Sequence, residues 1–71
     1  MVEKLKEMLD TEPFIPFRIV VTSGGSYDVH SPYQVAVGET RFDYFFPKSD
    51  RDATVRINQI VAFDALEDVK R

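Results

Sequence analysis

The sequence predicts a mainly β fold, with a short N-terminal helix followed by a five-stranded small barrel or strongly bent antiparallel sheet. Helical spacing of apolar residues is confined to residues 1–10. From Phe17 onward the apolar residues alternate with a period of two, and turn residues recur between the alternating segments. Closure would remove the exposed edges of such a sheet, so a barrel is favoured over an open helix-on-sheet sandwich.

The 71 residues suffice for one domain, divided into a helix (1–10), the barrel (17–64) and a charged tail (65–71). A domain this small buries only about 60% of the surface that its unfolded chain exposes. It has no cysteine that could form a disulfide or a thiolate metal site. Self-association is therefore the expected additional support for the fold.

Residues 1–10 have the pattern of an amphipathic helix, with charged side chains on one face and apolar side chains on the other. The apolar stripe consists of Val2, Leu5, Met8 and Leu9. A helix of this length is not stable alone in water, so the stripe must pack on the sheet. The connector at 12–17 is stiffened by Pro13 and Pro16, and its aromatic rings are expected to pin the helix to the sheet.

Alternation predicts the strands, and turn residues separate them. The predicted strands are 17–22, 27–30, 41–46, 53–57 and 60–63. Paired glycines in 23–26 suit a hairpin turn, and Pro32 breaks the ladder because proline cannot donate. A short apolar segment, 33–37, follows this break. A polar loop at 47–52 and a corner at 58–59 separate the last three strands.

Composition removes several classes of function. No segment is long and apolar enough to cross a bilayer, and residues 2–10 lack the apolar stretch of a secretory leader. A cytoplasmic location is therefore expected. The net charge of -3 excludes a diffuse basic surface for nucleic acid. No glycine-rich phosphate loop opens a helix, and we expect no cofactor.

Few residues could carry catalysis. His30, the single histidine, lies two residues after Asp28, on the same face of a predicted strand. Catalysis would also need a nucleophile and a pocket, and a structural zinc site would need four ligands. We therefore expect no enzyme and no metal site, with His30 in a structural role beside the break at Pro32. The acidic residues of 50–52 are expected at a solvated hairpin tip.

A local basic site is compatible with the acidic net charge. Three arginines lie on three different predicted strands, and Tyr33 or Phe45 could stack on a nucleic-acid base. The RNA-binding candidates are Arg56, Arg41, Arg18 and Tyr33. The alternative is that these arginines pair with carboxylates of neighbouring strands.

The segment 12–32, EPFIPFRIVVTSGGSYDVHSP, resembles the opening of a group of short bacterial proteins of unknown function. Their signature is a leucine, a spacer, Pro-Phe-x-Pro-Phe, a strand, a glycine turn, a second strand and His-Pro. The matching residues are Pro13, Phe14, Pro16, Phe17, Gly25 and His30, with Ser31 inserted before Pro32. The resemblance extends from Leu5 to Leu66 and supports the topology, but it brings no assigned activity.

Most of the chain also resembles the Sm-like proteins, which include the Hfq family of bacterial RNA chaperones. A helix, five strands, a variable loop and a tight final corner follow in the same order, and Gly25 stands where the first Sm motif has glycine. The residues that match the second Sm motif are Val55, Arg56 and Ile60. Ile57 replaces the glycine of that motif, and the family's base-binding loop is absent from 30–34. Arg56 is therefore the one RNA-contacting position that transfers.

The Sm resemblance implies a self-associating module, in which strand 53–57 of one subunit pairs with strand 60–63 of the next. The candidate interface residues are Val55, Ile57, Ile60, Val61 and Phe63. RNA is the ligand class that the same resemblance implies. Two alternatives stay open: the two strands could simply complete the barrel, and the chain could be an adaptor that binds a protein partner through Phe14 and Phe45.

Overall fold

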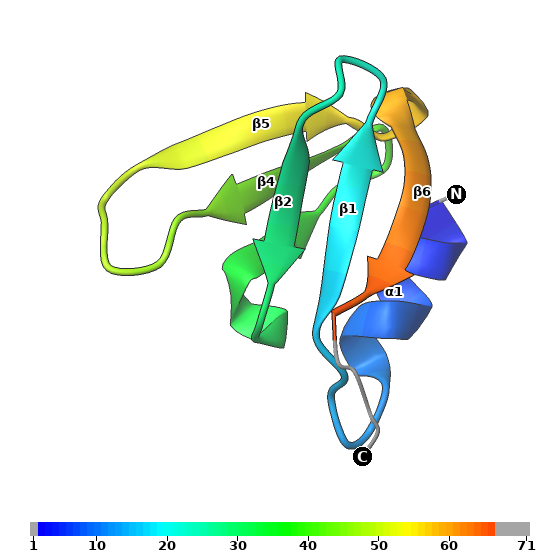
Figure 1. Ribbon diagram of the computed structural model, residues 1–71, viewed down its shortest axis with the longest axis vertical. Helices are drawn as coiled ribbons and strands as arrows, with labels where there is room; N and C mark the ends of the chain where they lie inside the picture. Colours follow the sequence, from blue (N-terminus) through cyan, green and yellow to red (C-terminus); the bar gives the residue numbers. More distant parts are fainter. Residues whose placement is uncertain (1, 67–71) are drawn as a thin grey trace.

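The computed structural model describes residues 2–66, which form one α-helix, six strands and two 3-10 turns (Figure 1). The helix is α1, Val2–Asp10. The strands are β1 Phe17–Val21, β2 Ser26–Val29, β3 Val35–Val37, β4 Arg41–Phe45, β5 Asp52–Arg56 and β6 Ile60–Ala65. The 3-10 turns are η1, Pro32–Gln34, and η2, Ile57–Gln59.

The strands form two three-stranded antiparallel sheets, so the prediction of a mainly β fold behind an N-terminal helix is confirmed. Sheet A has the strand order β2-β1-β6, and sheet B has the order β3-β4-β5. The predicted number of five strands was wrong, because Val35–Val37 pairs with β4 as a separate strand. Within residues 2–66 no ladder joins the two sheets into a closed barrel.

The chain passes between the two sheets at the two 3-10 turns. At η1, Ser31 caps the turn by accepting a 3.2 Å hydrogen bond from the backbone N–H of Tyr33. Pro32 has no N–H with which to continue the β2 ladder, which explains why the chain leaves sheet A here. At η2, the N–H of Ile57 donates to the carbonyl of Thr40 over 2.8 Å. The predicted corner at 58–59 is therefore confirmed, although Ile57 itself belongs to the turn and not to a strand.

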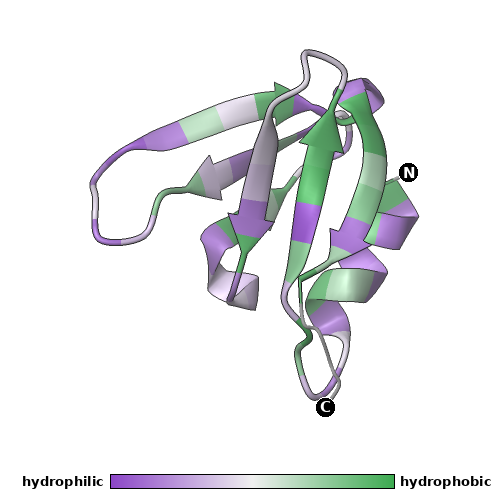
Figure 2. Cartoon of the chain, viewed as in Figure 1, coloured by the Kyte–Doolittle hydropathy of each residue, from purple (hydrophilic) through white to green (hydrophobic). Residues whose placement is uncertain are grey.

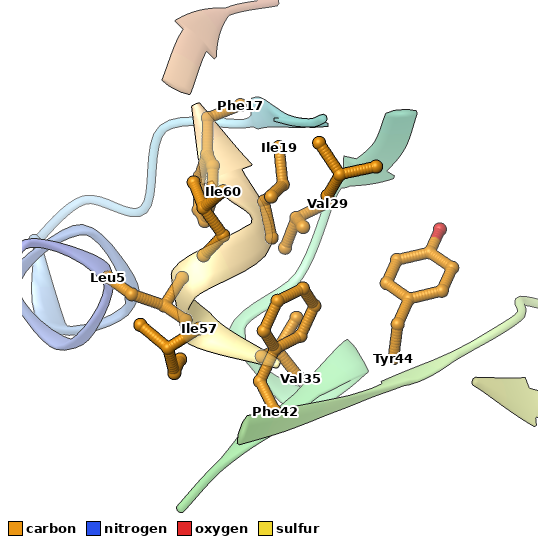
Figure 3. Packing of buried hydrophobic residues seen from close by; sticks show 10 residues of the cluster. Leu5, Phe17, Ile19, Val29, Val35, Phe42, Tyr44, Ile57 and Ile60 are labelled. Carbon is orange, nitrogen blue, oxygen red and sulfur yellow. The ribbon is translucent and has the colours of Figure 1, made fainter. Parts of the chain in front are cut away.

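The hydrophobic core lies between the sheets and under α1 (Figure 3). Its buried residues are Leu5, Phe17, Ile19, Val21, Val29, Val35, Phe42, Tyr44, Ile57 and Ile60. Leu5 is fully buried, and Figure 3 places its side chain beside Ile57 and Ile60. The helix therefore docks by the predicted apolar stripe, with Val2, Met8 and Leu9 partly buried around Leu5.

The aromatic connector holds the start of β1 in place. The rings of Phe14 and Phe17 lie 6.0 Å apart, and Phe17 also packs edge-on against Phe63 of β6 at 6.0 Å. Beyond β6, the N–H of Leu66 donates to the carbonyl of Pro16 over 3.1 Å. The expected tail therefore begins later than residue 65, and its residues 67–71 lie outside the described part.

Hydropathy follows this arrangement (Figure 2). Strands β1 and β6 are mainly hydrophobic, whereas the loop between β4 and β5 is mainly hydrophilic. That loop is the polar tip predicted at 47–52, and its residues are exposed up to the start of β5. No helix within residues 2–66 has both the length and the hydropathy needed to cross a membrane.

Candidate nucleic-acid interface

Arg41 of β4 and Arg56 of β5 are register partners in sheet B. The backbone bonds at the two ends of this ladder, Phe46 N–H to the Arg51 carbonyl and Ile57 N–H to the Thr40 carbonyl, fix the alternation of the pairs between them. By that alternation Arg41 and Arg56 form a non-hydrogen-bonded pair, the kind in which facing side chains lie closest. Both side chains are exposed. The two arginine side chains therefore start from directly opposite positions on the outer face of sheet B.

Neither arginine forms an ion pair with any residue in 2–66. Like charges directly opposite each other destabilise a ladder. An opening of about 410 Å³ lies beside Arg56 and is lined by Thr40, Asn58 and Glu39. A smaller opening of about 160 Å³ lies beside Arg41 and is lined by Asp43. The arginine pair is thus an accessible positive site that a bound anion would stabilise.

The rest of this outer face carries two carboxylates, Asp43 and Asp52, and one exposed aromatic ring. Thr54, opposite Asp43, donates a 2.7 Å hydrogen bond from Oγ1 to the carboxylate Oδ1 of Asp43. Phe45 follows on the same face and is 41% exposed. The face therefore has a pair of cations at one end and an exposed ring beside Asp52 at the other. Cations and stacking rings are the two elements that single-stranded nucleic acid binding uses.

Arg18 lies elsewhere, on the outer face of sheet A. Its Nε donates to Oδ1 of Asp28 over 2.7 Å, and Asp64 is its register partner on β6. The hydrogen bond to Asp28 raises the pKa of Arg18, and the same bond lowers the pKa of Asp28. The cross-strand pairing considered for the arginines is therefore present at Arg18. Asp28 and His30, which the sequence places on one face of a strand, have different surroundings. The carboxylate of Asp28 accepts the hydrogen bond from Arg18, whereas His30 is exposed directly after β2.

Tyr33 is also separated from the arginine pair. It is 89% exposed on η1, and it lines a groove together with Asp10 and Glu12. A phosphate group there would meet two carboxylates. Of the four RNA-binding candidates, the structure brings together only Arg41 and Arg56.

The five candidate interface residues differ in how much side chain they leave free. Ile57 and Ile60 are 8% and 6% exposed, because both belong to the core of the subunit. Val55 and Phe63 are half-buried against that core. Val61 is 53% exposed. Only Val61 therefore has most of its side chain available to another molecule.

Backbone groups are available along both strands that carry these residues. Strand β5 is an edge of sheet B, and β6 is an edge of sheet A. By the alternation derived above, the N–H and C=O groups of Thr54 and Arg56 point away from β4. The bond from Leu66 N–H to the Pro16 carbonyl likewise makes Phe63 and Ala65 point away from β1. Among the described residues no strand pairs with these outer sides.

At the outer edge of β2, side chains bond two backbone groups. The carbonyl of Asp28 accepts a 2.6 Å hydrogen bond from the hydroxyl of Tyr44, and the N–H of His30 donates to Oε1 of Gln34 over 2.7 Å. Strand β3 packs beside α1. Side chains and the helix thus engage one edge strand of each sheet, while nothing in residues 2–66 pairs with the outer backbone groups of β5 and β6.

Sequence reasoning missed two features. The guanidinium of Arg51 lies 5.0 Å from the ring centre of Phe46, a cation–π contact at the far end of β5. The second feature is the pairing of Arg41 with Arg56. A four-residue loop over 47–50 pairs Phe46 with Arg51, and counting back along both strands then pairs Arg41 with Arg56.

Comparison with protein-family models, with curated proteins and with solved structures found no match. Among residues 2–66, no group of three or more His, Cys, Asp or Glu side chains gathers where it could hold a metal ion. The fold and the site define a small two-sheet β domain with an exposed arginine pair and two open strand edges.

Proposed function

We propose that this chain is a non-enzymatic, self-associating small-barrel module, Sm-like or SH3-like in shape, that binds single-stranded RNA on the outer face of sheet B. The observation that carries the proposal is the Arg41–Arg56 pair, two like charges at facing positions for which residues 2–66 supply no ion-pair partner. The order of the elements supports the shape: a helix comes first, a polar loop separates β4 from β5, and the tight turn η2 separates β5 from β6. The Sm-like proteins, which the sequence resembles, have these three features with five strands where this chain has six.

Self-association would join β5 of one copy to β6 of the next. Within residues 2–66 no strand pairs with the outer side of either edge, and an unpaired edge is a template for pairing with another chain. The two edges are different surfaces, so the contact is head-to-tail and produces a ring when the rotation closes. Of the predicted interface side chains, Val61 contributes most exposed apolar surface, and Ile57 and Ile60 act by holding the edges in position.

Assembly would also explain how an acidic chain attracts RNA. The net charge of -3 repels phosphate at long range, but salt screens such repulsion beyond about 10 Å. A ring repeats the arginine pair once per subunit, and the repeated pairs act on one strand as linked sites. Linked binding raises the overall affinity beyond that of a single site. Phe45, on the same face, supplies a ring on which a base can stack.

The test is the fluorescence anisotropy of a labelled single-stranded RNA, titrated with the protein over a series of salt concentrations. We expect binding at low salt, and weaker binding by Arg41→Ala and by Arg56→Ala. Each variant should reduce the slope of log K against log salt by about 0.7 for every phosphate that it no longer neutralises. Arg51→Ala is the matched control, because it removes the same charge just before the start of β5, where Arg51 stacks on Phe46.

Two results would contradict the RNA proposal. One is the absence of binding by the wild-type protein at low salt. The other is an equal loss of affinity in Arg51→Ala and Arg56→Ala, which would mean that net charge and not the arginine pair determines binding.

A second candidate function is that of an adaptor for a protein partner. It is favoured by Phe45 and Ile15, which are 41% and 48% exposed. Phe14 is less suited to this role, because its ring packs against Phe17. A defined protein that stays bound after nuclease treatment, and that Phe45→Ser releases, would favour the adaptor over the RNA-binding module.

A further inference from the structure

A second surface with different chemistry lies at the end of α1. A groove of about 720 Å³ is formed where the last turn of α1, the connector and η1 meet. Its apolar wall includes Leu9, Phe14 and Pro32, and Tyr33 stands at its edge. The volume falls within the range of sites that take small ligands or short peptide segments.

The groove has a single sign of charge. Asp10 and Glu12 line it, and among the described residues no lysine, arginine or histidine does. Within residues 2–66 neither carboxylate forms an ion pair. The last turn of α1 also carries no basic residue, so the carbonyl groups at the helix end add negative potential. A cation is therefore the complementary ligand.

The exposed ring of Tyr33 favours a planar cation. Its ring is 89% exposed, while its backbone is held by the bond from its N–H to Oγ of Ser31. The neighbouring Gln34 fixes η1 further, since its side chain accepts from His30 N–H and donates to the hydroxyl of Tyr44 over 3.3 Å. A ring presented in this way has free faces for a planar cation. Guanidinium stacks on aromatic rings and is less strongly hydrated than an ammonium group.

We propose that this groove binds an arginine side chain of an extended segment from a protein partner. The guanidinium stacks on Tyr33 and pairs with Asp10 and Glu12, while apolar neighbours of that arginine pack against Leu9 and Phe14. This site is separate from the Arg41–Arg56 pair and does not depend on RNA binding or on assembly.

The test uses two capped tetrapeptides, one with arginine between leucine and proline and one with citrulline in place of the arginine. Citrulline keeps the shape of the side chain and removes its charge. Backbone amide chemical shifts of the isotope-labelled protein report binding. We expect the arginine peptide to shift Thr11 and Tyr33, and the citrulline peptide to bind about tenfold more weakly. Tyr33→Ala should weaken the arginine peptide about threefold.

Glu12→Gln should weaken the arginine peptide by a similar factor, and Glu39→Gln is its matched control, because Glu39 loses the same charge outside the groove. Tyr33 is almost fully exposed, so its replacement should leave the spectrum of the free protein intact. Equal affinity for the two peptides, or an unchanged affinity in Tyr33→Ala, would overturn the proposal. So would shifts centred on residues outside the groove.

Discussion

Arg41 and Arg56 face each other across the β4–β5 ladder as a non-hydrogen-bonded pair, and neither has an ion-pair partner within residues 2–66. A sheet selected only for stability would place an opposite charge or a β-branched residue at one of these positions. Binding of a phosphate would offset the repulsion. The arginine pair therefore lowers the stability of the free protein at the position where the proposed function needs positive charge.

Arg56→Thr should raise the stability of the fold. It removes the like-charge repulsion and introduces a residue that suits a strand, with an expected gain of about 0.2–1 kcal/mol. The gain should shrink as salt is added, because salt screens the repulsion in the wild-type protein. Urea unfolding at low and high salt measures both effects. A loss of stability at low salt would show that Arg56 has a favourable partner.

Tyr44→Phe should destabilise the fold by about 1–3 kcal/mol. The Tyr44 hydroxyl donates to the backbone carbonyl of Asp28 over 2.6 Å and so connects the two sheets. Removing it leaves that carbonyl on the β2 edge without this partner. Thermal unfolding measures the loss, and Tyr33→Phe, which alters an exposed hydroxyl, is the control. Equal stability of Tyr44→Phe and wild type would mean that solvent replaces the bond.

Leu5→Ala should lower the free energy of unfolding by about 2–5 kcal/mol, because the side chain of Leu5 in α1 is fully buried in the core. For a domain of this size such a loss is a large part of the total stability. Lys6→Ala changes the adjacent exposed residue and should have little effect. Circular dichroism during chemical unfolding measures the unfolding midpoints of the two variants. Similar midpoints for the two variants would show that α1 does not contribute its apolar stripe to the core.

Asp28 should make stability depend on pH in the acid range. Its hydrogen bond to Arg18 lowers the pKa of Asp28, so its stabilising contribution is present above the unfolded pKa of about 3.9. The contribution is lost as the pH falls through the folded pKa. Asp28→Asn should therefore be less stable than wild type at neutral pH, and the two melting curves should converge at low pH. A difference that stays constant across this range would rule out the ionised pair as its source.

Local patterns predicted much of the fold. The alternation in the predicted strand 41–46 places Phe42 and Tyr44 on one face and Phe45 on the other, and in the structure the first two are buried and Phe45 is exposed. Pro32 marked the end of the first ladder for the reason given above. The helix docked through Leu5 as its spacing predicted.

The composition of the candidate site was less predictable, because it depends on contacts between distant segments. Arg18 and Arg41 both lie on strands, yet only the pairing of β1 with β2 places a carboxylate beside Arg18. Tyr33 reaches the acidic groove only because η1 packs near the end of α1. Burial of Ile57 followed from the 3-10 geometry of η2, where a strand was expected.

The central claim is that open edges of β5 and β6 join copies of this chain. The molar mass in solution tests it most directly, measured by light scattering for the wild type, Thr54→Pro and Thr54→Val. Proline removes the outward N–H of Thr54 at an edge position that tolerates it, while valine keeps that N–H. Both replacements lose the hydrogen bond to Asp43.

We expect the wild type and Thr54→Val to have a molar mass that is a multiple of 8.2 kDa, and Thr54→Pro to be a folded monomer of 8.2 kDa. Circular dichroism confirms that the proline variant is folded. A wild-type mass of 8.2 kDa, or a folded Thr54→Pro variant that keeps the wild-type assembly, would contradict the account.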